Sequence, residues 1–131
     1  MRPAKIQAAI IPLITTAPFE NLIVQAPAGS GKTGAFAISS LIRVDLTMPP
    51  DKIQVLVVVN SRELCNQVYN VYQKLVLNTG ITLSNFCSKN KKPSMVCVTV
   101  HGSLGPMLSG RKPLNLKSLK LVVVDEADVF F

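Results

Sequence analysis

The sequence predicts a three-layer α/β/α fold, in which helices cover both faces of a mostly parallel sheet. Apolar strand-like runs alternate with helix-like segments for most of the 131 residues. The run 55–59 is apolar at every position, which is typical of a parallel strand buried on both faces. A chain of this length forms about one domain, and its parallel strands should be joined by right-handed crossovers.

A helix, a short strand and a second helix are expected in the first third of the chain. Pro3 suits the first turn of a helix whose apolar residues recur at helical spacing, until Pro12 ends or bends it. The apolar strand Leu22–Gln25 runs straight into a glycine-containing loop. A helix should follow from Lys32 to about Arg43.

Four further strands are expected from apolar runs, at Gln54–Val59, Ile81–Phe86, Met95–Val100 and Leu119–Val124. Ser61 can cap a helix after the first of these, because its hydroxyl can accept a hydrogen bond from a free amide. One face of that helix carries an apolar stripe, namely Leu64, Val68, Val71, Tyr72 and Leu75. Gly80 is expected at its C-terminus, where a left-handed conformation is favoured.

The composition favours a globular protein with a polyanionic partner. Apolar residues make up 48% of the chain, charged residues 16%, and the formal net charge is +7. Such a charge suits nucleic acid first and an acidic membrane surface second. No apolar run approaches the ~18 residues of a membrane span, and the first residues lack the apolar core of a signal peptide. We therefore expect a soluble, intracellular protein.

The cysteines Cys65, Cys87 and Cys97 are odd in number and widely spaced, without a C-x-x-C pair. We expect buried free thiols in a reducing compartment rather than a disulfide framework or a zinc site. The single histidine, His101, cannot complete a metal site without thiol ligands.

The segment Ala26–Thr33 has the spelling of a phosphate-binding loop between a strand and a helix. Its glycines, Gly29 and Gly31, allow a tight turn, so that the amides of this loop, which also holds Ala28 and Ser30, point inward at phosphates. Lys32 would contact the β- and γ-phosphates, and the Thr33 hydroxyl would bind Mg²⁺. The alternative is an ordinary glycine turn before a helix.

Two acids follow the last apolar strand. Asp125 and Glu126 should lie at the carboxyl edge of the sheet, where α/β proteins bind ligands. Asp125 can hold Mg²⁺, and Glu126 can accept a proton from the water that attacks a γ-phosphate. A solvated helix start is the alternative. Together with the phosphate loop, the acids predict a nucleoside triphosphate site.

The motif Asp125-Glu126-Ala127-Asp128, together with Ala26–Thr33, resembles the DEAD-box family of ATP-dependent RNA helicases. The resemblance implies a P-loop NTPase fold of the RecA-like type, with ATP and Mg²⁺ as cofactors and single-stranded or short duplex RNA as partner. Lys5-Ile6-Gln7 is similar to the family's adenine-reading motif, so Gln7 is the expected adenine contact. The segment 61–64 is similar to a motif that grips the RNA backbone, with Arg62 as the phosphate contact.

Within the family, the segments 5–7, 15–20 and 21–25 most resemble the helicase for mRNA export at the cytoplasmic face of the nuclear pore. This implies nuclear-pore or regulatory proteins as partners. It also implies a location in the cytoplasm, the nucleus or the nuclear envelope, and no membrane partner.

Two segments depart from the family pattern, and both normally contact RNA. Where the family has Thr-Pro-Gly-Arg, this chain has 100–103, which keeps Gly102 as the expected RNA contact but has no arginine. Where it has paired glycines, the chain has Asn85–Ser88. Basic clusters at Lys89, Lys91, Lys92, Arg111 and Lys112 either attract RNA phosphates or are solvated loops.

The resemblance covers residues 1–131 as part of the first RecA-like domain, truncated after the acidic strand, with the second domain absent. The missing Ser-Ala-Thr strand would lie between the phosphate-loop and acidic strands, so we expect marginal stability or self-association. We also expect weak Mg-ADP binding and negligible hydrolysis, because the transition-state arginine belongs to the second domain. The alternative is a divergent, catalytically incompetent module that binds a nucleotide or a protein.

Overall fold

A computed structural model describes residue 15 and residues 32–88, 92–110 and 114–124. The chain divides into two compact units, 1–43 and 44–131. The helix expected after Pro3 and the strand expected at Leu22–Gln25 lie outside the described residues. Among the helices that the structure describes, none is long and apolar enough to cross a membrane.

The described part of the first unit is α2, Lys32–Ile42, which confirms the helix expected after the glycine loop. Ala35 and Ala37 are fully buried, and so are two serines. The Ser39 hydroxyl donates to the Ala35 carbonyl at 2.6 Å, and the Ser40 hydroxyl donates to the Ala37 carbonyl at 2.9 Å. Buried hydroxyls are thereby satisfied by the helix backbone itself.

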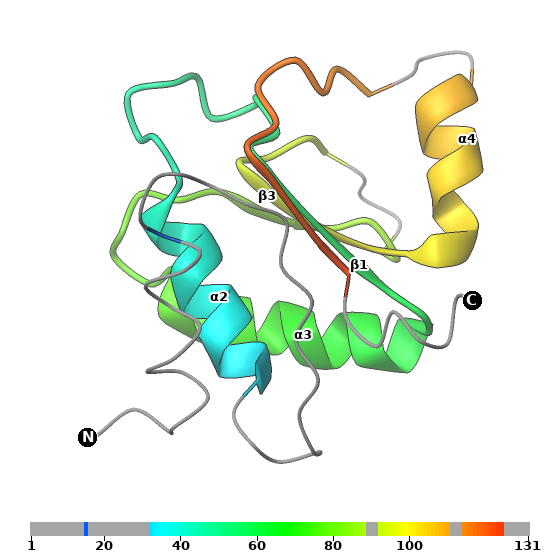
Figure 1. The fold of residues 1–131 in the computed structure, drawn as a ribbon, viewed down its shortest axis with the longest axis horizontal. Coiled ribbons are helices and arrows are strands. Elements are labelled where there is room, and N and C mark those ends of the chain that lie inside the picture. Colours follow the sequence, from blue (N-terminus) through cyan, green and yellow to red (C-terminus); the bar gives the residue numbers. More distant parts are fainter. Residues whose placement is uncertain (1–14, 16–31, 89–91, 111–113, 125–131) are drawn as a thin grey trace. The chain divides into compact units, whose positions relative to one another are not determined.

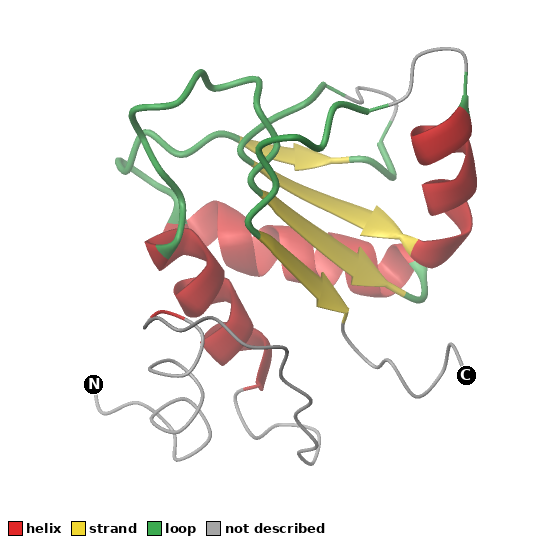
Figure 2. Cartoon of the chain, turned by 45° about the horizontal axis from the view of Figure 1, so that its top comes forward, coloured by secondary structure: helices red, strands yellow, loops and turns green. Residues whose placement is uncertain are grey.

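The second unit contains a four-stranded sheet in the order β2-β3-β1-β4, in which every pairing is parallel (Figures 1 and 2). Its strands are β1 Val55–Val59, β2 Leu83–Asn85, β3 Val96–Val100 and β4 Leu121–Val124. The parallel sheet and all four strands predicted for this part of the chain are confirmed.

Strand β2 is shorter than the predicted Ile81–Phe86. It begins late because the Thr82 hydroxyl accepts a hydrogen bond from the Met95 amide at 2.9 Å and donates to the Pro50 carbonyl at 2.8 Å. It ends at Asn85, whose side chain and carbonyl accept bonds from the amides of Cys87 and Ser88 and so turn the chain. Strand β4 likewise begins two residues after the predicted Leu119.

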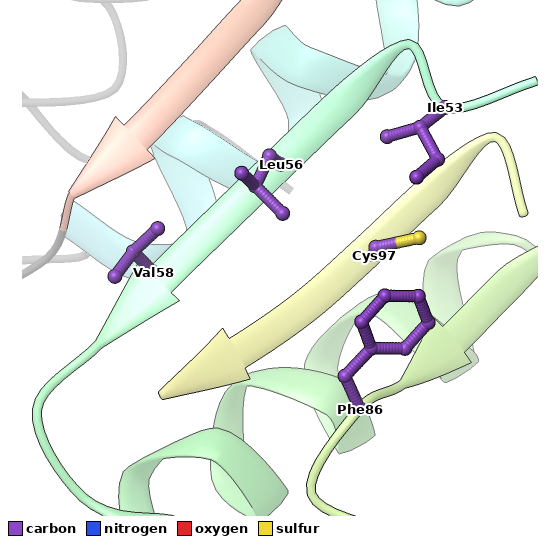
Figure 3. Close-up of a cluster of buried hydrophobic side chains, with 5 residues drawn as sticks. All are labelled: Ile53, Leu56, Val58, Phe86 and Cys97. Atoms are coloured by element: carbon purple, nitrogen blue, oxygen red, sulfur yellow. The ribbon is translucent and has the colours of Figure 1, made fainter. Parts of the chain in front are cut away.

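Strand β1 is central, because it pairs with β3 on one side and β4 on the other. All five of its residues are buried. Leu56 and Val58 belong to a core cluster with Ile53, Phe86 and Cys97 (Figure 3). Partly buried residues that follow β3 pack against this cluster: Leu104, Met107, Leu114, Leu116 and Leu119. Alternation along β1 places Val55, Val57 and Val59 on the opposite face.

Helix α3, Arg62–Leu75, contacts β1, β2 and β3 and lies behind the sheet in Figure 2. Ser61 caps it as predicted, since its side chain accepts a hydrogen bond from the Leu64 amide at 3.1 Å. Val68 and Tyr72 of the predicted stripe are buried together with Cys65, whereas Leu75 is 38% exposed.

The end of α3 differs from the prediction for Gly80. The C-cap is Val76, whose amide donates to the Tyr72 carbonyl at 2.9 Å, and Thr79 closes the turn that follows. Gly80 does have a left-handed φ of 81°, but it lies beyond this turn, and Asn78 already has a φ of 62°. Gly80 therefore shapes the connection to β2, and its assignment to the helix terminus was wrong.

A short 3-10 turn, His101–Ser103, and helix α4, Leu104–Ser109, directly follow β3. The sequence patterns did not predict this helix. Its Leu104 and Met107 pack on the core cluster, so tertiary burial supports a helix of only six residues.

The three cysteines are free thiols, as predicted. Cys65 and Cys97 are fully buried. Cys87 is only partly buried, because it lies in the turn after β2 rather than in a strand or helix.

Gln54 joins β1 to its surroundings and is fully buried. Its side chain donates to the Asp45 carbonyl at 3.0 Å and accepts from the Asp45 amide at 2.7 Å. Its carbonyl accepts from the amides of Lys120 and Leu121, while its amide donates to the Met95 carbonyl. One residue thus fixes the connector before β1 and the entries to both neighbouring strands.

Replacing Gln54 with alanine should lower the free energy of unfolding by about 2–3 kcal/mol, because the Asp45 backbone groups lose their partners. Urea denaturation followed by circular dichroism measures this. Gln73→Ala, at an exposed glutamine of α3, is the control and should change stability by less than about 0.5 kcal/mol. Equal effects of the two substitutions would contradict this role of Gln54.

Candidate functional site

The carboxyl ends of β1, β3 and β4 meet at one edge of the sheet, because all three strands are parallel. Val59 of β1 pairs with Val100 of β3. Val58 pairs with Val124, the residue that precedes Asp125 in the sequence. Asp125 and Glu126 themselves lie outside the described residues. Ligands of parallel α/β sheets bind at this edge.

Arg62 is the first residue of α3 and is exposed to solvent. It lies three residues beyond the end of β1, at a helix N-terminus whose free amides and dipole favour anions. The Ser61 side chain accepts from the Leu64 amide and the Ser61 carbonyl accepts from the Cys65 amide, so the amides of Arg62 and Glu63 remain as donors for a phosphate. The geometry suits the expected contact with a nucleic-acid backbone.

Gly102 lies in the turn that follows β3, next to the exposed His101. It is itself exposed, and a Cβ atom placed on it would meet no heavy atom within 4 Å. Packing therefore does not require glycine at this position, and the exposed backbone leaves room for a ligand to approach. Gly102 and Arg62 thus follow the carboxyl ends of two neighbouring strands, β3 and β1.

Lys32 and Thr33 are the first two residues of α2, and Thr33 is partly buried. A helix that starts directly after a glycine loop directs its free amides toward that loop. The remaining predicted nucleotide contacts lie outside the described residues: Gln7, Ala28, Gly29, Ser30, Gly31, Asp125 and Glu126.

Asn60 is a residue that the motif analysis missed. It lies directly after β1, and its side-chain oxygen is buried without a hydrogen-bond partner among the described residues. A buried amide oxygen is costly to leave unpaired, so a donor is expected there. A polar residue between an apolar strand and a capped helix was the available signal.

A cavity of about 330 Å³ lies between α3, β2 and the residues before β3. Its lining is mostly polar and comprises Tyr69, Leu83, Ser84, Asn85, Ser88, Lys92 and Ser94. Lys92 belongs to the predicted basic loop and is exposed, whereas Lys89 and Lys91 lie outside the described residues. The Lys92 cation suits an oxyanion such as phosphate. The serine hydroxyls of the cavity are already engaged, since Ser84 and Ser94 bond each other and the Lys92 carbonyl, and Ser88 donates to the Asn85 carbonyl.

Within residues 32–88, 92–110 and 114–124, no group of three or more His, Cys, Asp or Glu side chains could hold a metal ion. The Mg²⁺ ligands predicted from the sequence are Thr33 and Asp125, of which Asp125 lies outside the described residues. Both supply hard oxygen atoms, which Mg²⁺ prefers.

Residues 4–131 match the DEAD/DEAH box helicase family. The chain belongs to this family, and the resemblance drawn from its motifs is confirmed.

Curated relatives include the ATP-dependent RNA helicase DBP5 of Yarrowia lipolytica, 34% identical over 97% of this chain and 26% of that protein. The DEAD-box ATP-dependent RNA helicase 38 of Arabidopsis thaliana is 38% identical over 97% of this chain and 27% of that protein. The chain spans about a quarter of the length of these relatives. DBP5 names among the relatives confirm the predicted subfamily resemblance.

Solved structures confirm the RecA-like fold class. Saccharomyces cerevisiae Dbp5 bound to RNA and ADP BeF3 is similar with a TM-score of 0.85 and 33% identity, over 97% of this chain and 33% of that chain. A Dbp5 variant bound to Nup159, a Gle1 variant, IP6 and ADP has a TM-score of 0.86, with 33% identity over 98% of this chain and 35% of that chain. A hypothetical ATP-dependent RNA helicase of Sulfolobus tokodaii has a TM-score of 0.82, with 26% identity over 100% of this chain and 39% of that chain.

Two glycine substitutions test the geometry of the edge. Gly102→Ala should leave the free energy of unfolding within about 0.5 kcal/mol of the wild type, because its Cβ meets open space. Gly110→Ala should destabilise by about 1–3 kcal/mol, because its Cβ would lie 2.5 Å from the Pro106 carbonyl oxygen. Thermal and urea denaturation of both variants measures these changes in the free energy of unfolding. A reversed order of stability would contradict the described turn after β3.

Proposed function

We propose that residues 1–131 are part of the first RecA-like domain of an ATP-dependent RNA helicase, which remodels RNA or RNA–protein complexes together with a second RecA-like domain. The observation that carries the proposal is the shared carboxyl edge of β1, β3 and β4. The sequence places the motif residues Arg62, Gly102 and Asp125 within a few residues of the ends of these three strands.

The nucleotide is bound by the loop 26–33 and by Gln7. Backbone amides around Gly29 and Gly31 solvate the phosphates, and Lys32 neutralises the β- and γ-phosphates. The position of Lys32 and Thr33 at the start of α2 supports this arrangement. Gln7 selects adenine through its side-chain amide, which offers both a donor and an acceptor to that base edge.

Hydrolysis requires an acceptor for the proton of the attacking water, and Glu126 fills this role. Thr33 and Asp125 would hold Mg²⁺, which supplies positive charge against the developing negative charge on the phosphates. Because the transition-state arginine comes from the second domain, residues 1–131 alone bind Mg-ADP weakly and turn over little ATP.

RNA lies along the carboxyl edge, where Arg62 and the free amides of α3 contact phosphates and the Gly102 backbone allows close approach. Lys92 adds a cation beside the polar cavity. The net charge of +7 assists this binding through counterion release. The RNA-bound Dbp5 structure, similar over 97% of this chain, supports the assignment.

Partners and location follow from the Dbp5 relatives. One similar structure has Dbp5 with Nup159 and a Gle1 variant, so we assign nuclear-pore and regulatory proteins as partners, at the cytoplasmic face of the pore.

Residues 1–131 alone also self-associate. Val122 and Val124 of β4 are 48% and 42% exposed, beside the buried Leu56 and Val58, so β4 is the expected contact between two copies of the chain. Sizing chromatography over a concentration series tests this self-association.

Lys32→Ala should weaken Mg-ADP binding roughly tenfold to a hundredfold, the cost of a lost charged hydrogen bond to phosphate. Titration calorimetry measures the affinity, with Lys74→Ala at the far end of α3 as the matched control.

In the full-length helicase, Glu126→Gln should lower RNA-stimulated ATP turnover about a hundredfold or more. Unchanged turnover would favour the alternative of a catalytically incompetent binding module.

Arg62→Ala should weaken binding to single-stranded RNA and reduce the slope of log affinity against log salt by about 1, because one phosphate contact is lost. Lys74→Ala removes the same charge from the opposite end of the helix and should leave affinity and slope unchanged. Fluorescence anisotropy across a salt series, on the full-length protein, measures both. Equal losses in the two variants would indicate only non-specific charge attraction.

A further inference from the structure

Two of the three cysteines lie close together where α3 begins and β2 ends. The Oδ1 atom of Asn85 accepts a hydrogen bond from the Cys65 thiol at 3.4 Å and from the Cys87 amide at 2.9 Å. The Nδ2 atom of Asn85 donates to the Oδ1 atom of Asn66 at 2.9 Å. A single side chain therefore holds the first turn of α3 against the turn after β2, with one cysteine on each.

The two thiols differ in their access to solvent. Cys87 is partly exposed, whereas Cys65 is fully buried. Burial and the neighbouring Cys87 thiol raise the pKa of Cys65 to about 12. Cys65 is therefore protonated at neutral pH and reacts slowly on its own, so a soluble oxidant reaches Cys87 first.

The third cysteine is separate from this pair. Cys97 is fully buried in the core cluster, and its thiol donates to the Ser94 carbonyl at 3.5 Å. Burial raises its pKa to about 11. Cys97→Ala thus offers a control for thiol chemistry that does not involve the pair.

We propose that Cys65 and Cys87 form an oxidisable dithiol site, which peroxides convert to a reversible intramolecular disulfide. The Cys87 sulfur attacks the O–O bond of hydrogen peroxide, forming a sulfenic acid and one water. Cys65 then loses its proton to solvent, the Cys65 thiolate attacks the Cys87 sulfur, and the departing hydroxide takes up a proton to form a second water. The two sulfurs lose two electrons in total, and one peroxide is reduced.

Disulfide formation replaces the hydrogen-bonded link through the Asn85 side chain with a covalent bond. The Asn85 side chain bonds both cysteine residues, so it must move aside for the sulfurs to meet. The disulfide then ties the first turn of α3, which also holds Arg62, to the turn after β2. Excess dithiothreitol restores both thiols by exchange.

The reduced 131-residue chain, at a dilution where sizing chromatography finds a monomer, is treated with stoichiometric hydrogen peroxide. The product is confirmed as monomeric on a non-reducing gel, its remaining thiols are alkylated, and its peptides are mapped by mass spectrometry. We expect the loss of two of the three thiols, a peptide pair linked through Cys65 and Cys87, and full reversal by dithiothreitol. Decay of the sulfenic acid should accelerate about tenfold per pH unit between pH 7 and 9, as the Cys65 thiolate fraction rises.

Two variants complete the test. Cys97→Ala should form the same link at the wild-type rate, and Cys87→Ser should form no intramolecular disulfide. The mapping of the wild-type chain decides even if a variant fails to fold. Accumulation of sulfinic acid at Cys87 with Cys65 still free, or a link through Cys97, would overturn the proposal.

Discussion

The parallel pairing of β1 with both β3 and β4 is the constraint on which the described part of the second unit depends. Because β1 has a neighbour on each side, its five residues are buried and carry no charge. Gln54 enforces the arrangement at the start of β1, where its backbone serves both neighbours and its side chain holds Asp45. The buried Gln54 side chain does not destabilise the fold, because both its oxygen and its nitrogen form hydrogen bonds.

This pairing also decides where chemistry can occur. Three parallel strands that end together place the residues after them at one edge, so Arg62 and Gly102 follow paired strand ends although they are far apart in sequence. The opposite edge carries the connectors that Gln54 and Thr82 hold in place. Family membership is shown, while the functional role of the carboxyl edge and of its individual residues is our proposal.

The elements that the sequence predicted well are those with strong local signals. The apolar run of β1, the glycine loop before α2 and the cap of α3 each specify their element within a few residues. Helix α4 and the short β2 depend on contacts distant in sequence, such as Met107 on the core cluster and Thr82 with Pro50, which no local pattern contains. The buried oxygen of Asn60 and the proximity of Cys65 to Cys87 also depend on such distant contacts, so they could not be predicted. Lys32, Arg62 and Asp125 were predicted because they belong to sequence motifs.

Hydrogen–deuterium exchange of the full-length helicase, measured with and without RNA and a nonhydrolysable ATP analogue, tests the central claim most directly. We expect ligands to protect the segments after β1 and β3, residues 60–64 and 101–104, at the same time. The connectors at the other edge, residues 44–52 and 76–82, should exchange at unchanged rates. Protection of those connectors, with unchanged exchange after β1 and β3, would contradict a functional carboxyl edge.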